Sequence, residues 1–360
     1  MSDMHHKRFV SFLIRHNTKK FWLIFAAVVA VLGIAAIIYF VWFSKQPLNR
    51  ADPKGSGTAA EPSIKIVPSP LSGEEVSSDL AKRPITGVII ENSPNARPQS
   101  GLASAGVIFE AIAEGGITRL LVLYQEGQPE LIGPVRSIRP YYVDWSMGYE
   151  ASVAHVGGSA EGLQQIRTLP GARDLDQFAN GAYFFRSTDR YAPHNVYTRT
   201  SLLDELSDKR GYKSSKFEPV PRKKPTPSEA PNAQNIAVNF SSNLFRANYT
   251  YNPAENNYLR SIGGVPHLDR ESGQQLKSTV IVVMKTSFSL HPDGQHYVYG
   301  TIGSGEALVF QDGTVTIGTW EKASRTDMIK LKNAEGQPIK LNPGQTWYEA
   351  LPSNKTVTYE

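Results

Sequence analysis

The sequence predicts an α+β protein: an N-terminal transmembrane helix, then a mixed α/β domain, then an all-β domain. Three observations support this prediction. An apolar run without a charged side chain lies near the N-terminus, at residues 21–43. Strand-like and helix-like patterns alternate over residues 83–215, whereas only strand-like runs occupy residues 236–360.

The apolar run FWLIFAAVVAVLGIAAIIYFVWF, residues 21–43, has the length of a membrane span. As a helix it would be about 34 Å long, against roughly 30 Å for the hydrocarbon core of a bilayer. Trp22 and Trp42 lie at its two ends, where aromatic rings prefer the membrane interface. A buried core helix would show a polar face, and a cleaved signal peptide would be shorter. We therefore expect an uncleaved anchor.

The charges flanking this run predict its orientation. Residues 1–20 carry five lysine and arginine side chains against Asp3 alone. The positive-inside rule places such a tail in the cytoplasm. We expect a single-pass protein of the cell membrane with its C-terminal body outside the cell.

Composition excludes several classes of protein. The formal net charge is +5, and most of it comes from residues 1–20, so no basic stripe remains in the body for nucleic acid. The absence of cysteine excludes disulfides, thiolate zinc sites and cysteine nucleophiles. No Walker or Rossmann glycine pattern is present, and His291 and His296 lack the spacing of a metal motif. We expect neither a cofactor nor a metal.

Two segments rich in proline and small residues divide the chain. Residues 44–82 have little apolar periodicity and predict a flexible stalk. Residues 216–235 contain FEPVPRKKPTPSEAPNAQN from Phe217 and predict a linker or a long loop. The two domains are therefore expected at residues 83–215 and 236–360.

The first domain mixes both kinds of element. Its strands are short apolar runs bounded by Gly, Pro or Asn, and its helices have polar residues such as Ser159 at their start. Thr200 is a candidate cap for a last helix that ends at Gly211. Strands are expected at 85–92, 107–114, 118–125, 151–158 and 182–187, and helices at 139–149, 159–169 and 201–211.

The second domain contains apolar or alternating runs without helical spacing. Asp312-Gly313 lies between two alternating runs and is the strongest hairpin signal in the chain. Strands are expected at 236–241, 278–290, 296–302, 307–320 and 328–332.

Several strings resemble the YerB-like family of exported bacterial proteins. They are RPITGVIIENSPNARPQSGLASAGVIFEAIAEGGITRLLVLYQ, GPVRSIRPYYVDW, HVGGS and RYAPHNVYT, followed by GSGEALVF, GTWEK and PGQTW. The resemblance extends from about Arg83 to Pro352 and implies an envelope location and a two-part domain of unknown function. Many family members carry a lipid on an N-terminal cysteine. This chain departs from that pattern, because its anchor is expected at residues 21–43.

The polar residues of the first domain carry the clearest functional signal. Every basic side chain from Arg83 to Asp208 is arginine, whereas lysine predominates elsewhere. Arginine is favoured where a planar fork grips a carboxylate or phosphate, or where a cation is partly buried. Ten candidate ligand-binding residues lie in or near the family strings: Glu110, Glu114, Arg119, Arg136, Arg139, Tyr141, Arg186, Arg190, His194 and Asn195.

Three functions remain open. The first is a cleft that binds an anionic polymer of the cell envelope, with Arg139 and His194 lining it and Arg136 more internal. The second is an envelope glycan or peptide hydrolase in which Glu114 or Asp144 acts with His194. The third is a scaffold that docks an envelope protein, with the arginines buried in structural pairs. The fraction of each arginine that reaches solvent distinguishes these functions.

Overall fold

The computed structural model describes residues 27–40, 42 and 64–360. The chain divides into two compact units, Met1–Ser63 and Ile64–Glu360. In the first unit, residues 27–40 and 42 are helical and exposed. Among the residues described, no helix is both long and apolar enough to cross a membrane. Three sets of predicted residues lie outside the described ones. They are residues 1–20 of the tail, residues 21–26, 41 and 43 of the anchor, and residues 44–63 of the stalk.

The second unit begins before the predicted stalk ends. Residues from Ile64 onward form the hairpin β1 (Ile66–Pro68) and β2 (Glu75–Ser77) and the short helix α2 (Ser78–Ala81). Leu71 in the connecting turn is buried in the core, and its backbone N–H donates to Gln125 Oε1. The stalk prediction is therefore wrong for residues 64–82, because Ser69, Leu71 and Ser72 are buried and hydrogen bonds attach this segment to the body.

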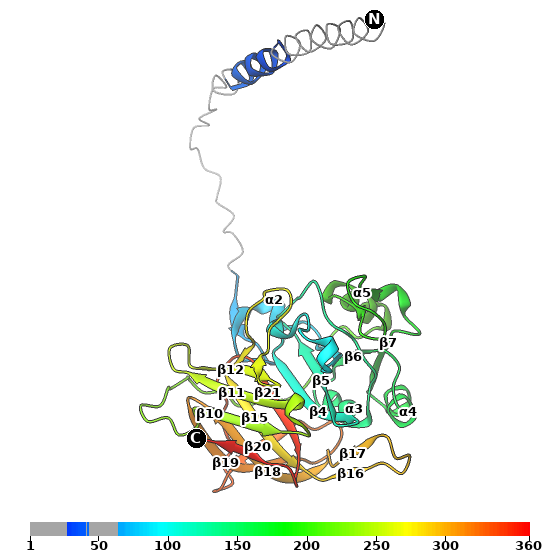
Figure 1. The fold of residues 1–360 in the computed structure, drawn as a ribbon, viewed down its shortest axis with the longest axis vertical. Helices are drawn as coiled ribbons and strands as arrows, with labels where there is room; N and C mark the ends of the chain where they lie inside the picture. The colour runs from blue at the N-terminus through cyan, green and yellow to red at the C-terminus, as the bar shows by residue number, and fades with distance from the viewer. Residues whose placement is uncertain (1–26, 41, 43–63) are drawn as a thin grey trace, which may run out of the picture. The chain divides into compact units, whose positions relative to one another are not determined.

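A ten-stranded sheet forms the centre of the second unit (Figure 1). Both predicted domains contribute to it, because β21 pairs in parallel with β4 and with β15. The strands in spatial order are β20 (Lys330–Asn333), β19 (Thr314–Lys322), β18 (Gly303–Gln311), β15 (Val280–Thr286), β21 (Thr346–Pro352), β4 (Val107–Glu114), β5 (Ile117–Tyr124), β3 (Thr86–Glu91), β6 (Ser152–His155) and β7 (Arg173–Asp176).

The boundary predicted at residues 216–235 thus divides the sequence but not the sheet. Residues 83–215 and 236–360 belong to one compact unit, with one continuous sheet and a shared core. Composition marked the proline-rich segment correctly as irregular. It could not reveal that β4 and β21 pair, since this contact joins residues more than two hundred positions apart.

A smaller sheet packs on the core from the second half of the chain. It consists of β13 (Val265–Pro266), β12 (Asn257–Ile262), β11 (Arg246–Asn252), β10 (Asn235–Asn239) and β22 (Val357–Tyr359), with β14 (Lys277–Ser278) also paired to β12. Tyr249 and Phe240 of this region join Val282 and Tyr348 of the large sheet in one buried cluster. The second half is therefore strand-rich, as the alternating runs predict.

Helices cover the half of the large sheet that contains β3 and β6 (Figure 1). They are α3 (Pro140–Met147), α4 (Ala160–Thr168) and α5 (Thr200–Arg210). Short 3-10 turns occupy Pro94–Ala96, Leu102–Ser104, Gly181–Tyr183 and Asn243–Phe245. Both faces of β3 are covered, since Ile89 belongs to one buried cluster and Val88 and Ile90 to another. This explains its uninterrupted apolar run.

Local signals predicted several boundaries well. The Ser159 side chain caps α4 by accepting from the N–H of Gly162, and Gly211 ends α5 with a left-handed conformation at φ +79°. Asp312 and Gly313 form the turn of the β18–β19 hairpin, both with positive φ. Thr200 differs from its prediction, because it is the first helical residue and Arg199 precedes it as the cap. Two further hairpins are β8–β9 (Phe185–Arg186, Val196–Tyr197) and β16–β17 (Phe288–Leu290, Tyr297–Tyr299).

Candidate functional site

The most deeply buried charges belong to a network between the two sheets. Arg260 Nη1 donates to Glu349 Oε1 over 2.8 Å, and its Nη2 donates to Glu110. The guanidinium also lies 4.0 Å from the ring centroid of Trp347. Arg260 and both carboxylates are completely buried. Glu110 is therefore part of the core and presents no surface to a ligand, which corrects its assignment as a ligand-binding residue.

A second network surrounds the end of the β4–β5 hairpin. Glu114 accepts from Arg119 over 2.6 Å and from Arg139 over 2.7 Å. Both arginines are buried, and each also donates to a backbone carbonyl, of Ser137 or Ile138. Coulombic attraction and hydrogen bonds from the two guanidiniums hold the pKa of Glu114 below its usual range although burial opposes this.

This second network corrects two further assignments. Arg119 and Arg139 fix the ends of β4, β5 and α3 through Glu114 instead of lining a cleft. Tyr141 is buried at the start of α3 and contributes to the lining of a hollow beside that helix. The Tyr141 hydroxyl donates to the carbonyl of Ile112 over 2.9 Å, and its side chain is buried. The expectation that Arg139 faces solvent while Arg136 is internal is wrong, because the structure reverses the two.

Two of the remaining candidates, Arg136 and His194, contact Glu91 at the end of β3, and Arg186, Arg190 and Asn195 lie on the same β8–β9 hairpin as His194. We use the name Glu91 cluster for Glu91, Arg136, Arg186, Asp189, Arg190, His194, Asn195 and Arg270. Glu91 Oε2 lies 2.9 Å from Arg136 Nε and 2.8 Å from His194 Nδ1. The Ser93 hydroxyl donates to Oε1 over 2.8 Å. Glu91 thus holds a guanidinium and an imidazole together.

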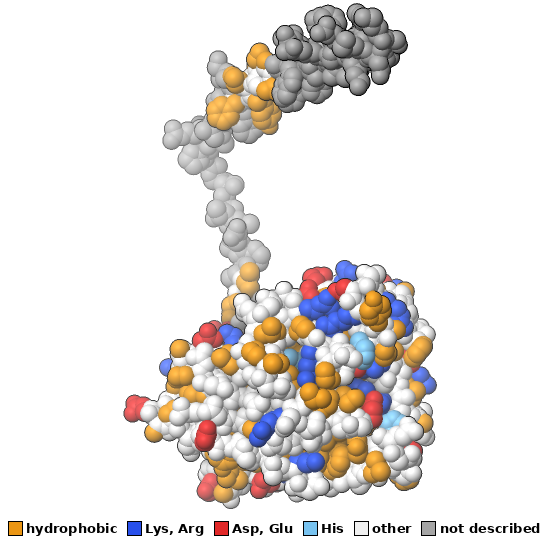
Figure 2. Space-filling model, in the orientation of Figure 1, with side chains coloured by type: hydrophobic (Ala, Val, Ile, Leu, Met, Phe, Trp, Pro, Cys, Tyr) orange, Lys and Arg blue, Asp and Glu red, His pale blue; other side chains and the backbone are white. Residues whose placement is uncertain are grey.

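Exposure distinguishes this cluster from the two networks. The side chains of Arg136 and His194 are 25% and 23% exposed, whereas Glu91 between them is 6% exposed. The anion that orients the group is therefore buried, and the Arg136 guanidinium and the His194 imidazole are partly exposed. Figure 2 shows basic, acidic and histidine side chains together on the face over this half of the fold.

Four chain segments supply the cluster: the end of β3, the segment before α3, the β8–β9 hairpin and the segment after β13 that carries Arg270. The segment that precedes α3 runs beside β3, because Arg136 N–H donates to the Ile89 carbonyl over 2.8 Å. The long loop of the β8–β9 hairpin carries Arg190 and His194. Arg190 Nη2 donates to the Pro98 carbonyl over 2.6 Å, which attaches that loop to the segment after β3. Burial lowers the pKa of Arg190.

The rim of the cluster contains further paired arginines. Arg186 Nη1 donates to Asn195 Oδ1 over 2.7 Å. Arg270 pairs with Asp189 and donates to the Tyr197 hydroxyl over 3.3 Å. Sequence patterns missed Glu91, Asp189 and Arg270. Glu91 lies in ITGVIIEN, part of the first family string, at the end of a predicted strand. This position is the one sequence signal that could have indicated Glu91 as a candidate.

Asp144 lies elsewhere, in a hollow beside α3 and α4. It accepts from the Thr301 hydroxyl over 2.5 Å and from Arg325. Burial raises its pKa. The carboxylate that contacts His194 is Glu91, not Glu114 or Asp144, so neither predicted acid–base pair is assembled.

His155 is completely buried and has a structural environment. Its Nε2 lies 3.0 Å from Asp174 Oδ1, and its Nδ1 lies 2.8 Å from the Gly157 carbonyl. His291 and His296 both contact Asp293, at 3.1 and 2.7 Å. Within residues 27–40, 42 and 64–360, no group of three or more His, Cys, Asp or Glu side chains could hold a metal ion.

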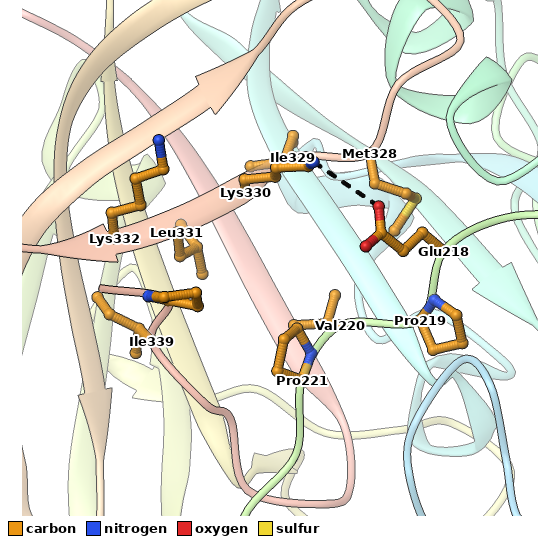
Figure 3. Close-up of a pocket in the computed structure, with 11 residues that line it drawn as sticks. Glu218, Pro219, Val220, Pro221, Met328, Ile329, Lys330, Leu331, Lys332 and Ile339 are labelled. Carbon is orange, nitrogen blue, oxygen red and sulfur yellow. Dashed lines mark ion pairs between the residues drawn. The ribbon is translucent and has the colours of Figure 1, made fainter. Parts of the chain in front are cut away.

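A hollow of about 160 Å³ lies between the proline-rich segment and β20 (Figure 3). Val220 and Pro221 face Leu331 and Ile339 across it, and Lys330 pairs with Glu218 at 3.7 Å. No predicted site residue lines this hollow, so it is separate from the Glu91 cluster.

Two family models match the chain, and together they span most of its second unit. The N-terminal domain of the protein of unknown function DUF3048 matches residues 71–213, and the DUF3048 C-terminal domain matches residues 236–348. The chain belongs to the DUF3048 family. This confirms the resemblance to YerB-like proteins.

Comparisons with individual proteins agree with this assignment. The chain is 31% identical over 302 residues to "Putative lipoprotein YerB" of Bacillus subtilis (strain 168), a match that covers 82% of this chain and 89% of that protein. It is also similar to the crystal structure of the YerB protein from Bacillus subtilis, with a TM-score of 0.73 and 29% identity. That match covers 81% of this chain and 99% of the other and supports the mixed α+β fold.

The two DUF3048 segments cooperate at the Glu91 cluster. Glu91, Arg136, Arg190 and His194 lie in the N-terminal segment, and Arg270 comes from the C-terminal segment. The same division applies to the buried network, where Glu110 meets Arg260. A single sheet therefore unites the two DUF3048 domains, and the cluster depends on both.

Proposed function

We propose that this chain is an exported, membrane-anchored protein of the bacterial cell envelope that binds an anionic polymer through the Glu91 cluster. The name of the Bacillus subtilis relative, a lipoprotein, supports the location, because lipoproteins are held at a membrane by acyl chains. This sequence contains no cysteine to carry such a lipid. Residues 21–43 would provide the anchor instead, with residues 1–20 in the cytoplasm.

The charge balance of the cluster supports an anionic ligand. The cluster contains four guanidinium groups, of Arg136, Arg186, Arg190 and Arg270, and two carboxylates, of Glu91 and Asp189. The surplus is positive before any protonation of His194. Guanidinium groups bind phosphate and carboxylate with two parallel hydrogen bonds, which gives this surplus both charge and geometry.

The arrangement around Glu91 carries the proposal. The buried carboxylate fixes Arg136 and His194 with their outer edges exposed. A ligand would then find these groups already oriented, and little side-chain entropy would be lost when it binds. A purely structural pair would instead bury the cations, as Arg119 and Arg139 are buried.

Binding of two polymeric probes tests the site. We expect the full chain in detergent to bind sodium polyphosphate or poly-L-glutamate saturably, and more weakly as salt is added. Arg136→Ala should weaken binding by about tenfold or more. Arg210→Ala is the matched control, because Arg210 is exposed on α5 and donates to Asn180 Oδ1, outside the Glu91 cluster. An equal loss in both variants would leave only non-specific charge attraction.

Protease treatment of intact cells tests the location. We expect protease outside the cell to remove the body, residues 64–360, and to leave residues 1–20 protected. Complete protection of the body, with digestion only after lysis, would contradict an external location.

A second candidate function is hydrolysis, which the Glu91–His194 contact favours. The carboxylate engages Nδ1, so Nε2 is the imidazole nitrogen that can take a proton from water. That water oxygen would form a bond to the phosphorus of a phosphodiester as the bond to the leaving oxygen breaks. With bis(4-nitrophenyl) phosphate as the probe, wild type should release nitrophenol and His194→Gln should not. Equal release by both proteins would exclude this role.

A further inference from the structure

A separate hollow of about 270 Å³ lies between α3, α4 and β17. A cavity of about 10–15 Å³ on this scale holds one water molecule, so the hollow has room for a ring-sized group. Asp144 and Gln165 approach it from the N-terminal DUF3048 segment, and Thr301 and Arg325 from the C-terminal segment. None of the Glu91 cluster lines it.

One wall of the hollow is a continuous row of polar side chains. Gln165 Nε2 donates to Glu161 Oε1 over 3.1 Å, and Arg325 Nη1 donates to Gln165 Oε1 over 3.3 Å. Arg325 also donates to Asp144, which accepts from Thr301 on its other oxygen. The row is therefore oriented before any ligand arrives.

This row retains capacity for further hydrogen bonds. The Arg325 side chain is 41% exposed, and its Nη2 and Nε have no hydrogen-bond partner within the described part of the chain. Glu161 is half exposed, and its Oε2 lies 3.9 Å from His291 Nε2, beyond hydrogen-bond range. Free donors and a free acceptor thus lie along one wall.

The lining of the hollow also includes apolar and aromatic residues. They are Tyr297 and Tyr299 of β17, with Val298 and Ile302, and Tyr299 is almost completely buried. Tyr297 is held by stacking on Phe288 with centroids 4.7 Å apart, and Tyr299 packs on Tyr141 at 4.8 Å. A ring that enters the hollow would meet the polar row and the aromatic side chain of Tyr297.

Charge and shape together indicate the ligand. Asp144 and Glu161 are balanced by Arg325 and by Lys322, whose amine donates to the carbonyls of Arg325 and Asp327 behind the hollow. This balance gives no preference for an anion. Planar amide, carboxylate and guanidinium groups bond pairs of hydroxyls, while the C–H face of a sugar ring packs on aromatic side chains. We propose that this hollow binds a neutral sugar residue.

Lys322 supports the site by positioning its neighbours. Its buried amine holds the loop that carries Arg325, and burial lowers its pKa to about 8. Truncation of Lys322 would therefore disturb the loop as well as the charge balance. For this reason the test uses residues on the surface of the row.

Saturation-transfer NMR on the full chain, in a detergent without a sugar headgroup, tests the proposal. The probes are glucose, galactose, mannose and N-acetylglucosamine, each titrated to about 50 mM because a single sugar ring is expected to bind with a Kd near the millimolar range. At least one probe should bind saturably. Gln165→Ala and Arg325→Met should each weaken that binding by about tenfold.

Gln164→Ala is the matched control, since Gln164 is the exposed neighbour on α4 and lies outside the hollow. It should bind like wild type. Should Arg325→Met fail to fold, Gln165→Ala decides alone. No saturable binding by any of the four sugars, or equal affinity in Gln165→Ala and Gln164→Ala, would overturn the proposal. Polyanion binding at the Glu91 cluster is measured separately, so either proposal can fail without the other.

Discussion

The Arg260 network and the Glu91 cluster contain the same kinds of charged side chain and differ in their access to water. In the network, Arg260 and its two carboxylates are completely buried between the sheets. In the cluster, Glu91 is buried, whereas its partners Arg136 and His194 reach the surface. One arrangement is closed on itself, and the other presents cations outward.

This difference determines whether the removal of one charged side chain lowers stability or weakens binding. Removal of a partner from a closed pair leaves a buried charge without compensation, and the protein loses stability. Removal of an outward-facing cation leaves no large uncompensated charge in the interior, so the affinity for a ligand decreases instead of the stability. The comparison yields four predictions, ordered by the size of the expected change in stability.

Arg260→Ala should have the largest effect. The change leaves Glu110 and Glu349 buried without their shared cation, at a cost of roughly 3–5 kcal/mol. A domain is typically stable by about 5–15 kcal/mol, so much of that stability would be lost. Urea unfolding of residues 64–360 measures this. The control is Arg270→Ala, which removes a partly exposed pair with Asp189 and should cost less than about 1 kcal/mol.

Arg139→Ala should have an intermediate effect. Glu114 keeps Arg119 as a partner and is about one-third exposed, so the loss should be roughly 1–3 kcal/mol, less than for Arg260→Ala. The same urea experiment applies, with Arg136→Ala alongside. A larger loss of stability for Arg136→Ala than for Arg139→Ala would contradict the explanation that the burial of Arg139 makes its removal costly.

The contrast between Arg136 and Arg139 also shows where sequence reasoning stops. Both lie in the string GPVRSIRPYY, three positions apart, in a segment that is extended up to Arg139. Side chains an odd number of positions apart in extended backbone point to opposite sides. The string therefore predicts that one arginine is buried and the other is not. It cannot say which, because the deciding partners, Glu91 and Glu114, come from different strands.

Features that depend on neighbouring residues, such as caps and turns, were predicted from the sequence, whereas the pairing of distant strands was not. Ser159, Gly211 and the Asp312-Gly313 turn behave as their residue types require, because each is decided by its own few neighbours. The shared sheet could not be predicted, since β4 and β21 pair across most of the chain. Arg260 was likewise missed, because its partner Glu110 lies 150 positions away.

Glu349→Gln should change the pH dependence of stability. Burial raises the pKa of Glu349, and the neighbouring Glu110 adds to this. The folded state therefore holds a proton that the unfolded chain releases at lower pH, so stability falls as the pH rises from the ordinary carboxyl range toward neutral. The variant cannot ionise at this position. Over the same pH range its free energy of unfolding should fall less than that of wild type, by about 1 kcal/mol or more, because one pKa unit corresponds to about 1.4 kcal/mol. Parallel stability curves for both proteins would contradict the raised pKa.

His194→Ala should have the smallest effect on stability, and His155→Ala provides the matched comparison. Each histidine contacts a carboxylate, Glu91 at 2.8 Å or Asp174 at 3.0 Å, but His155 is completely buried and His194 is not. After His194→Ala, Glu91 still has Arg136 and Ser93, so the cost should stay below about 1 kcal/mol. His155→Ala removes a buried ring with two hydrogen bonds and should cost about 2–3 kcal/mol. Polyphosphate binding should show the opposite order, with a loss of about tenfold in His194→Ala alone. If His194→Ala unfolds as readily as His155→Ala while both bind polyphosphate normally, the Glu91 cluster is a structural network like that of Arg260.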